Sequence, residues 1–149
     1  MIRSRFVVAL LIIAALAYAC GPRSRASEPS RQDAVSGPPV ASSLNVRVGP
    51  GVAFAFHITN NAPKRLEINF PSGQTHDIVV LDSVGREVWR WSEGKMFTQS
   101  LQNKVLESNE TLTYEASWKP EARRGKYVAV AQLMSANHPL EQRVEFDIP

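Results

Sequence analysis

Three histidines, His57, His76 and His138, are the residues that could support acid–base or nucleophilic catalysis. A serine hydrolase needs a serine, a histidine and a carboxylate in a supported geometry, but the sequence has no G-x-S-x-G nucleophile turn. His76 and Asp77 are adjacent, and adjacent strand residues point to opposite faces of a sheet. His57 falls on the polar face of an expected strand, and His138 stands beside a proline in an expected turn. We therefore expect three solvent-exposed histidines and a protein that is not an enzyme.

Metal-binding patterns are also missing from the sequence. It has no H-x-x-x-H or C-x-x-C spacing and no acidic loop of EF-hand type. A blue-copper site needs two histidines, a cysteine and usually a methionine, but the only cysteine, Cys20, lies near the N-terminus. A site built from His76, Met96 and His138 stays open, although no spacing favours it. We expect no metal and no cofactor.

The N-terminus has the pattern of an export signal. Two arginines precede an apolar run over residues 6–17, and Ala17-Tyr18-Ala19 stands directly before Cys20. This order of charge, apolar run and small residues predicts a secretory signal peptide over residues 1–19. The apolar run has about a dozen residues, whereas a spanning helix needs about 20. An uncleaved membrane anchor is therefore the less favoured alternative.

Cys20 sits where bacterial lipoproteins carry the cysteine that is acylated and becomes the mature N-terminus. The pattern departs from the usual one at Ala17, where leucine is common, and at the large Tyr18. Acyl chains give stable attachment to a membrane without a spanning helix. We expect lipid attachment at Cys20 and a location in the cell envelope, with Gly21 favouring the outer membrane or periplasmic face of a host with two membranes. An ordinary signal peptide with an incidental cysteine is the alternative.

The charge balance argues against nucleic-acid binding. The chain has 17 basic and 14 acidic residues, a net charge of +3. Loss of residues 1–19 would remove Arg3 and Arg5 and no acidic residue, so the net charge would fall to +1. Nucleic-acid binding depends on many cations that neutralise phosphates, and this balance does not provide them.

The remaining chain divides into a spacer and a domain. Residues 20–42 are rich in proline, serine, glycine and charge, and such a segment cannot bury enough apolar surface to fold. We interpret it as a flexible tether that holds the rest away from the membrane. Residues 43–149 have the length of one domain.

Strand patterns dominate the domain. Apolar and polar residues alternate in 44–48, 54–58, 66–70, 112–118 and 144–148. This period of two places each apolar set on one face of a strand. Glycine, proline and asparagine clusters between the runs indicate turns. Many short strands at this spacing predict an all-β sandwich or barrel.

A single cysteine excludes an intramolecular disulfide, so aromatic residues must fill the core. Trp89, Trp91 and Trp118 are the candidates. Tyr127 stands two residues before Ala129, as a tyrosine does in strand F of many immunoglobulin-like sandwiches. A strand that merely contains a tyrosine is the alternative.

Several motifs in order point to one family. They are N-x-x-P-K-x-L-E-I-N-F (60–70), F-P-S-G-Q-x-x-D (70–77), G-x-E-V-W-R-W-S (85–92), K-M-F-T-Q (95–99), L-T-Y-x-x-x-W (112–118) and G-x-Y (125–127). Together they extend over about residues 54–133, and this stretch resembles the BsuPI family, the bacterial intracellular proteinase inhibitor domain. Two features differ from the family: its usual P-G-E turn is Ser108-Asn109-Glu110 here, and this chain carries an export signal although the family is named intracellular.

The resemblance implies an immunoglobulin-like antiparallel β-sandwich that binds and inhibits a serine protease of subtilisin type. Two loops are candidates for the contact. The first contains Lys95, Met96, Phe97, Thr98 and Gln99, and the second contains Pro71, Ser72, Gly73, Gln74 and Asp77. A structural role is the alternative for both loops. Met96 and Phe97 would then fold back on the core, and Asp77 would hold a loop through backbone N–H groups.

Two functions from different classes are therefore compatible with the sequence. In the first, the protein is a membrane-anchored inhibitor whose partner is a serine protease. In the second, it is a non-inhibitory interaction module that binds another envelope protein, for example by strand addition at an exposed sheet edge.

Overall fold

A computed structural model describes residues 37–121 and 124–149. The described residues form nine β-strands and no helix, so none of them belongs to a helix that could cross a membrane. The strands are β1 (Val40–Val48), β2 (Val52–Asn60), β3 (Leu66–Phe70), β4 (His76–Asp82), β5 (Glu87–Arg90), β6 (Gln102–Leu106), β7 (Thr111–Trp118), β8 (Gly125–Leu133) and β9 (Leu140–Ile148). The predicted signal peptide and Cys20 lie outside the described residues.

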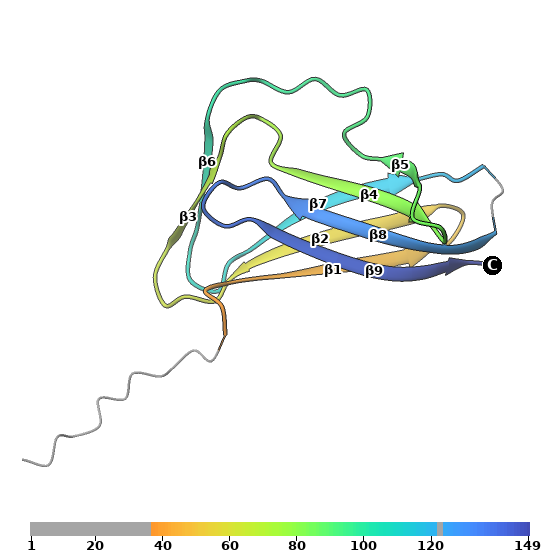
Figure 1. Cartoon of the computed structure of the whole chain (residues 1–149). Helices are drawn as coiled ribbons and strands as arrows, with labels where there is room; N and C mark the ends of the chain where they lie inside the picture. Colours follow the sequence, from red (N-terminus) through yellow and green to blue (C-terminus); the bar gives the residue numbers. More distant parts are fainter. Residues whose placement is uncertain (1–36, 122–123) are drawn as a thin grey trace, which may run out of the picture. The chain divides into compact units, whose positions relative to one another are not determined.

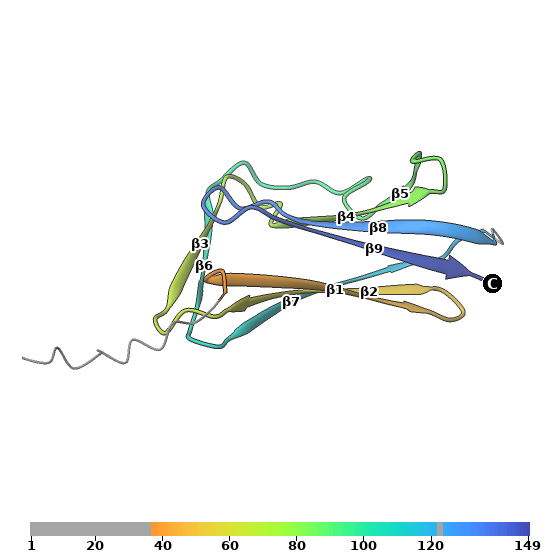
Figure 2. The same cartoon turned by 60° about the horizontal axis from the view of Figure 1, so that its bottom comes forward.

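Two antiparallel sheets make up the sandwich. One has the strand order β1-β2-β7 and the other β5-β4-β8-β9, and Figure 2 shows them stacked face to face. A third, two-stranded sheet, β3-β6, runs across one end of the sandwich (Figure 1). The predicted all-β, immunoglobulin-like antiparallel sandwich is confirmed.

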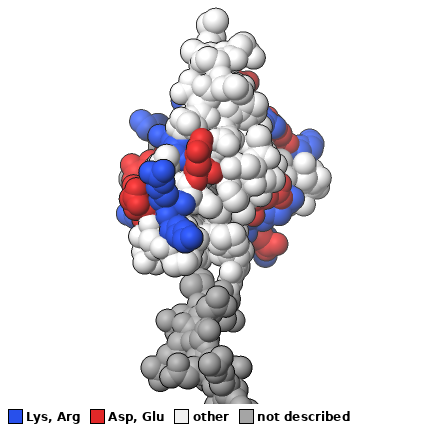
Figure 3. All heavy atoms as spheres, turned by 90° about the vertical axis from the view of Figure 1, so that its left-hand side faces the viewer, with Lys and Arg blue, Asp and Glu red and all other residues white. Residues whose placement is uncertain are grey.

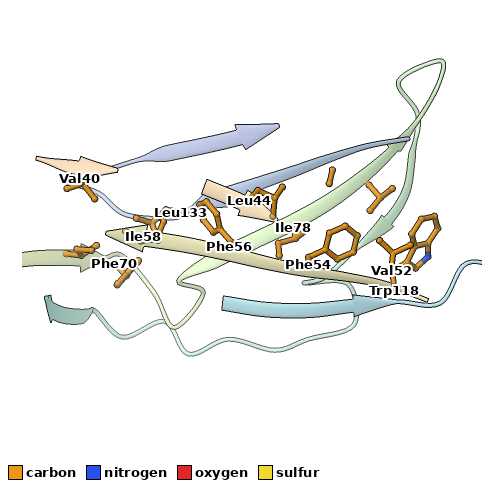
Figure 4. Packing of buried hydrophobic residues seen from close by; sticks show 14 of the residues in the cluster. Val40, Leu44, Val52, Phe54, Phe56, Ile58, Phe70, Ile78, Trp118 and Leu133 are labelled. Atoms are coloured by element: carbon orange, nitrogen blue, oxygen red, sulfur yellow. The ribbon is translucent and has the colours of Figure 1, made fainter. Parts of the chain in front are cut away.

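Period-two alternation determines which side chains enter the core. In β2, Val52, Phe54, Phe56 and Ile58 are all buried, whereas the residues between them face outward. β4 and β8 contribute Ile78, Val80, Ala129, Ala131 and Leu133 from the opposite sheet. Figure 4 shows members of this core, among them Phe54, Phe56, Ile58, Ile78 and Leu133. Fully burying one such large apolar side chain contributes about 1.5–3 kcal/mol.

Aromatic rings close the end of the sandwich where β1 joins β2. Trp89 stacks on Phe54 with ring centroids 5.6 Å apart and lies 6.4 Å from Trp118. Tyr127 packs edge-on against Trp118 at 5.4 Å and stacks on Phe146 at 5.7 Å. Trp118 is buried, and Trp89 and Trp91 pack against the core, so all three tryptophans contribute to it as expected.

Asn60 joins four segments at the other end of β2. It is fully buried, and its side-chain amide lies 2.9 to 3.1 Å from the carbonyl oxygens of Lys64, Leu106 and Glu107. Its side-chain oxygen accepts a hydrogen bond from the Ala62 N–H at 2.9 Å. This explains why an asparagine precedes the loop to β3: an amide can donate and accept at once, and a buried polar group must find such partners.

Asn109 accounts for the unusual turn before β7. Its φ is 63°, in the left-handed region, and it is the only non-glycine residue with a positive φ in the described part of the chain. Glycine adopts this conformation most readily, and asparagine is among the few other residues that tolerate it. Asn109 can therefore occupy the position that glycine has in the P-G-E turn.

Two strands differ from the sequence expectations. β1 begins at Val40, which is buried, so residues 40–42 lie in a strand rather than in the spacer. β6 was not predicted. It carries few apolar residues, and its pairing with β3 holds it in the structure.

Candidate functional site

The two loops proposed from the sequence lie together at one end of the sandwich (Figure 1). The first, with Lys95–Gln99, lies between β5 and β6, and the second, with Pro71–Gln74, lies between β3 and β4. The Gly73 N–H donates a hydrogen bond to the Thr98 carbonyl oxygen at 2.9 Å. A Cβ atom on Gly73 would lie only 2.6 Å from Thr98 Oγ1 and 3.2 Å from Thr98 N. Glycine at position 73 is therefore what lets the two loops touch.

The Asp77 carboxylate anchors the start of the longer loop. Only 3% of Asp77 is exposed. Its Oδ1 accepts hydrogen bonds from the backbone N–H groups of Ile78 at 2.9 Å and Ser92 at 3.2 Å. Its Oδ2 accepts from the Ser92 hydroxyl at 2.8 Å and from Arg90 Nη1 at 2.6 Å. Asp77 therefore holds a loop through backbone N–H groups, which is the structural alternative considered for it, and is not available to a partner.

Arg90 continues this network to the surface. Its Nε and Nη2 atoms donate to the two carboxylate oxygens of Glu87, at 3.0 and 2.6 Å, in a bidentate arrangement. The hydrogen bonds from Arg90 lower the pKa of Glu87. The hydrogen bonds to Glu87, followed by the one to Asp77, raise the pKa of Arg90. The guanidinium is thus neutralised by two carboxylates, one buried and one exposed.

A stack of rings supports the loop from the core outward. His76 lies between Tyr114 and Trp91, with centroid distances of 4.0 Å to each. Phe97 packs against Trp91 at 5.9 Å, and the Lys95 ammonium lies 4.1 Å from the centre of the Trp91 ring. Ring pairs of this kind contribute about 0.5–1.5 kcal/mol each, and an exposed cation–π contact about 0.5–1 kcal/mol. Phe97 therefore folds back on the domain, as the structural alternative for this loop predicted.

Met96 has the opposite placement, because 98% of it is exposed. The structural alternative predicted that Met96, like Phe97, folds back on the core, and this prediction is wrong for Met96. Neither Asn69–His76 nor Met96–Asn103 contains a charged residue. Figure 3 looks onto the end that carries β3 and β6: uncharged residues occupy its top, and charged residues gather on its flanks. These two segments thus offer an uncharged surface on which the apolar Met96 and Leu101 are exposed.

The other predicted residues have supporting or exposed positions. The Ser72 hydroxyl accepts a hydrogen bond from the Gln74 N–H at 3.2 Å, which shapes the shorter loop. Pro71, Thr98 and Gln99 are exposed beside it. All ten predicted residues therefore lie in two segments joined by the contact between Gly73 and Thr98, although no sequence motif indicated that contact.

The expectation that His76 is solvent-exposed is wrong, because only 6% of it is exposed. His76 is in phase with Ile78 and Val80, so the period of β4 places it on the inner face, and this signal could have located it. His57 and His138 are partly exposed. His57 lies on the outer face of β2, where Nδ1 is 2.8 Å from Thr113 Oγ1. Within residues 37–121 and 124–149, no three His, Cys, Asp or Glu side chains gather as metal ligands.

Replacing Asp77 tests its role as anchor. Asp77→Ala would remove four hydrogen bonds and leave the Ser92 donors without their acceptor, so the free energy of unfolding should fall by about 2–4 kcal/mol. Urea denaturation would measure this change. Glu93→Ala removes an exposed carboxylate from the same loop and should shift stability by no more than about 0.5 kcal/mol. Equal effects of the two substitutions would contradict the anchoring role of Asp77.

The buried His76 should make stability depend on pH. Burial lowers its pKa from 6.5 to about 4; the Asp77 carboxylate opposes this shift, and the Lys95 ammonium adds to it. Because the unfolded chain binds the proton more readily, the free energy of unfolding should fall as pH drops from 6.5 towards 4, by up to about 1.4 kcal/mol per pH unit. Urea denaturation at pH 7.5, 5.5 and 4.5 would measure this loss. His76→Phe keeps a ring but cannot titrate, so it should show a smaller loss; an identical loss would exclude His76 as the cause.

The sequence matches the family model described as BsuPI, intracellular proteinase inhibitor, over residues 40–138. This region extends from β1 through β8 and includes both loops of the site. The match therefore covers more than half of the chain. No curated protein matches the sequence closely enough to count as a relative.

Comparison with solved structures found only weak likenesses. A protein named ApaA from Bordetella pertussis is 17% identical with a TM-score of 0.42, and the alignment covers 73% of this chain and 91% of that one. The yjhA protein from Bacillus subtilis is 13% identical with a TM-score of 0.38, covering 72% and 90%. A β-galactosidase from Bacteroides fragilis, 13% identical with a TM-score of 0.38, aligns over 76% of this chain but only 16% of its own length. Likeness at this level supports no inference about function.

The family match agrees with the motifs from Asn60 to Tyr127 and with the antiparallel sandwich that presents them. On this evidence, the chain belongs to the BsuPI family of intracellular proteinase inhibitors.

Proposed function

We propose that this protein is a membrane-anchored proteinase inhibitor that blocks a subtilisin-type serine protease with the tip formed by its two loops. The family to which the chain belongs supports the inhibitory role and a protease as partner. Inhibitors of this kind work by binding, so the protein has no catalytic residues of its own in this proposal. The partner is a protein and not a nucleic acid.

The observation that carries the proposal is that the loop tip is held in place before any partner arrives. Asp77 fixes Ser92 at the base of the longer loop, and Gly73 bonds Thr98 further along it. Trp91, directly before Ser92, supports Lys95 and Phe97, which lie between these two fixed points. A loop that is already ordered loses little conformational entropy on binding, which strengthens an interaction of a given area.

The composition of the tip is suited to a protein cleft. Residues 69–76 and 96–103 of the tip carry no charge, and the exposed Met96 can adapt to an apolar pocket because its side chain is unbranched and flexible. Binding energy at protein interfaces is concentrated in a few such anchors near the centre of the contact. Polar neighbours such as Gln74, Thr98 and Gln99 would form the rim.

The anchor is the second part of the proposal. Acylation of Cys20 would place the domain in the cell envelope, at the outer membrane or periplasmic face of a host with two membranes. The residues up to Val40 would then act as a tether between lipid and sandwich. An inhibitor held in this way would meet proteases of the envelope or the surroundings rather than those of the cytoplasm.

An inhibition titration tests the protease-blocking role. Full-length chain in mild detergent would be added to a subtilisin-type and to a trypsin-type protease, and hydrolysis of a small chromogenic peptide would be followed. We expect a linear loss of subtilisin-type activity to a sharp equivalence point near one inhibitor per protease. Unchanged activity at a large molar excess, with the circular dichroism of the folded domain intact, would exclude the inhibitory role. The non-inhibitory interaction module would then be the better description.

Metabolic labelling tests the anchor. Cells that express the full-length chain would be fed an alkyne analogue of palmitate, and the chain should become labelled and sediment with membranes. Cys20→Ser should abolish the label and release the protein from the membrane fraction. A Cys20→Ser chain that still sediments with membranes would instead indicate an uncleaved N-terminal span.

A further inference from the structure

In the segment from Lys95 to Thr98, side chains that rest on the domain alternate with exposed ones. The backbone makes no turn or bend over these four residues. Successive side chains of an extended chain point to opposite sides. Lys95 and Phe97 both rest on the Trp91 ring, and Met96 between them is 98% exposed. One side of the segment is thus attached to the domain, and Met96 projects from the other side into solvent.

The centre of the same segment has main-chain groups that are free to form hydrogen bonds with a partner. The Lys95 N–H donates to the Ser92 carbonyl at 3.1 Å, and the Thr98 carbonyl accepts from Gly73. Between these two bonds, the N–H and C=O groups of Met96 and Phe97 have no hydrogen-bond partner in the described part of the chain. Proteins that bind extended peptides use such free main-chain groups for strand pairing and use pockets for alternate side chains.

We propose that the loop binds its protease in the manner of a substrate, with the Met96 side chain in the primary specificity pocket and the Met96–Phe97 peptide bond at the catalytic serine. This inference rests on the proposed inhibitory function and names the residue that selects the target. A methionine fits an apolar pocket and adapts to its shape. The target is therefore a serine protease whose primary pocket is apolar and uncharged.

The geometry also explains why such a bond would be cut slowly and rejoined. The serine hydroxyl oxygen would add to the Met96 carbonyl carbon, the C–N bond to Phe97 would break, and the serine proton would pass through the catalytic histidine to the Phe97 nitrogen. Phe97 would stay in place because its ring packs on Trp91 and the next residue is bonded to Gly73. Its amine would then attack the acyl-enzyme carbonyl, release the serine with its proton restored, and re-form the bond.

Other exposed apolar residues lack this combination. Leu101 is 82% exposed but follows a bent stretch at 99–100. Val84 is 72% exposed but belongs to the turn between β4 and β5, where the Asp82 carboxylate accepts a hydrogen bond from its N–H at 3.0 Å. Full exposure, a backbone without turn or bend, and free main-chain groups in the described part of the chain coincide at Met96.

A change of specificity provides the test. Full-length wild-type, Met96→Lys, Met96→Leu and Val84→Lys chains would be titrated against a subtilisin-type protease and against trypsin, whose pocket accepts lysine. Met96→Lys should weaken inhibition of the subtilisin-type enzyme by about 30-fold or more and create inhibition of trypsin. Met96→Leu should still inhibit the subtilisin-type enzyme, because leucine also fits an apolar pocket. Val84→Lys, which adds the same charge outside the two loops, should behave as the wild type.

A second measurement locates the bond. After long incubation of the complex, mass spectrometry should find a cut between Met96 and Phe97 and none elsewhere in the two loops. If Met96→Lys inhibits the subtilisin-type protease as well as the wild type, or if the cut lies at another bond, the substrate-like role of Met96 is wrong while the inhibitory function stands. If the wild type inhibits neither protease, the inhibitory function fails and this inference fails with it.

Discussion

The Asp77 carboxylate joins β4 to the residues that follow β5, and the position of the candidate site depends on it. A buried carboxylate is costly unless donors surround it, and here four hydrogen bonds reach its two oxygens. The same bonds determine where Ser92 lies and therefore where the chain leaves the sheet. Trp91, directly before Ser92, is thereby presented to the loop that follows. A directional polar network at the base thus sets the direction of a loop that has few polar contacts of its own.

Above this base, the support changes from hydrogen bonds to ring contacts. Tyr114, His76 and Trp91 come from β7, from β4 and from the residue after β5, so the stack joins both large sheets to the loop. Ring contacts are weaker and less directional than the bonds to Asp77. They are sufficient because the Gly73–Thr98 bond holds the far part of the loop. The loop is therefore restrained at its start, along one side and near its end.

Much of the fold was predictable because β-strands that bury one face show their period in the sequence. β2, β7 and β9 alternate clearly, and the tryptophans at 89 and 91 fall on one face of one segment. β6 could not be recognised in this way, since four of its five residues are exposed and only Leu106 reaches the core. Its strand conformation follows from pairing with β3, and a long-range pairing leaves no local signal.

The candidate site was predictable as two loops but not as one surface. The contact between the loops passes through the backbone of Gly73 and Thr98, and backbone groups are the same in every sequence. What the sequence does record is the consequence, a glycine where a Cβ would collide with Thr98. His76 was misjudged for a different reason: histidine is usually exposed, and that general tendency was given more weight than its position in phase with Ile78 and Val80.

The exposure of Met96 has a consequence for how this protein can diverge. Gly73, Asp77, Trp91 and Phe97 are each constrained by neighbours, so changes there would disturb the domain. Met96 touches almost nothing in its own chain, and a surface substitution away from other contacts usually changes stability little. The residue at position 96 can therefore be exchanged with little effect on folding, and under the proposed role of Met96 copies of the gene could acquire different targets by single mutations.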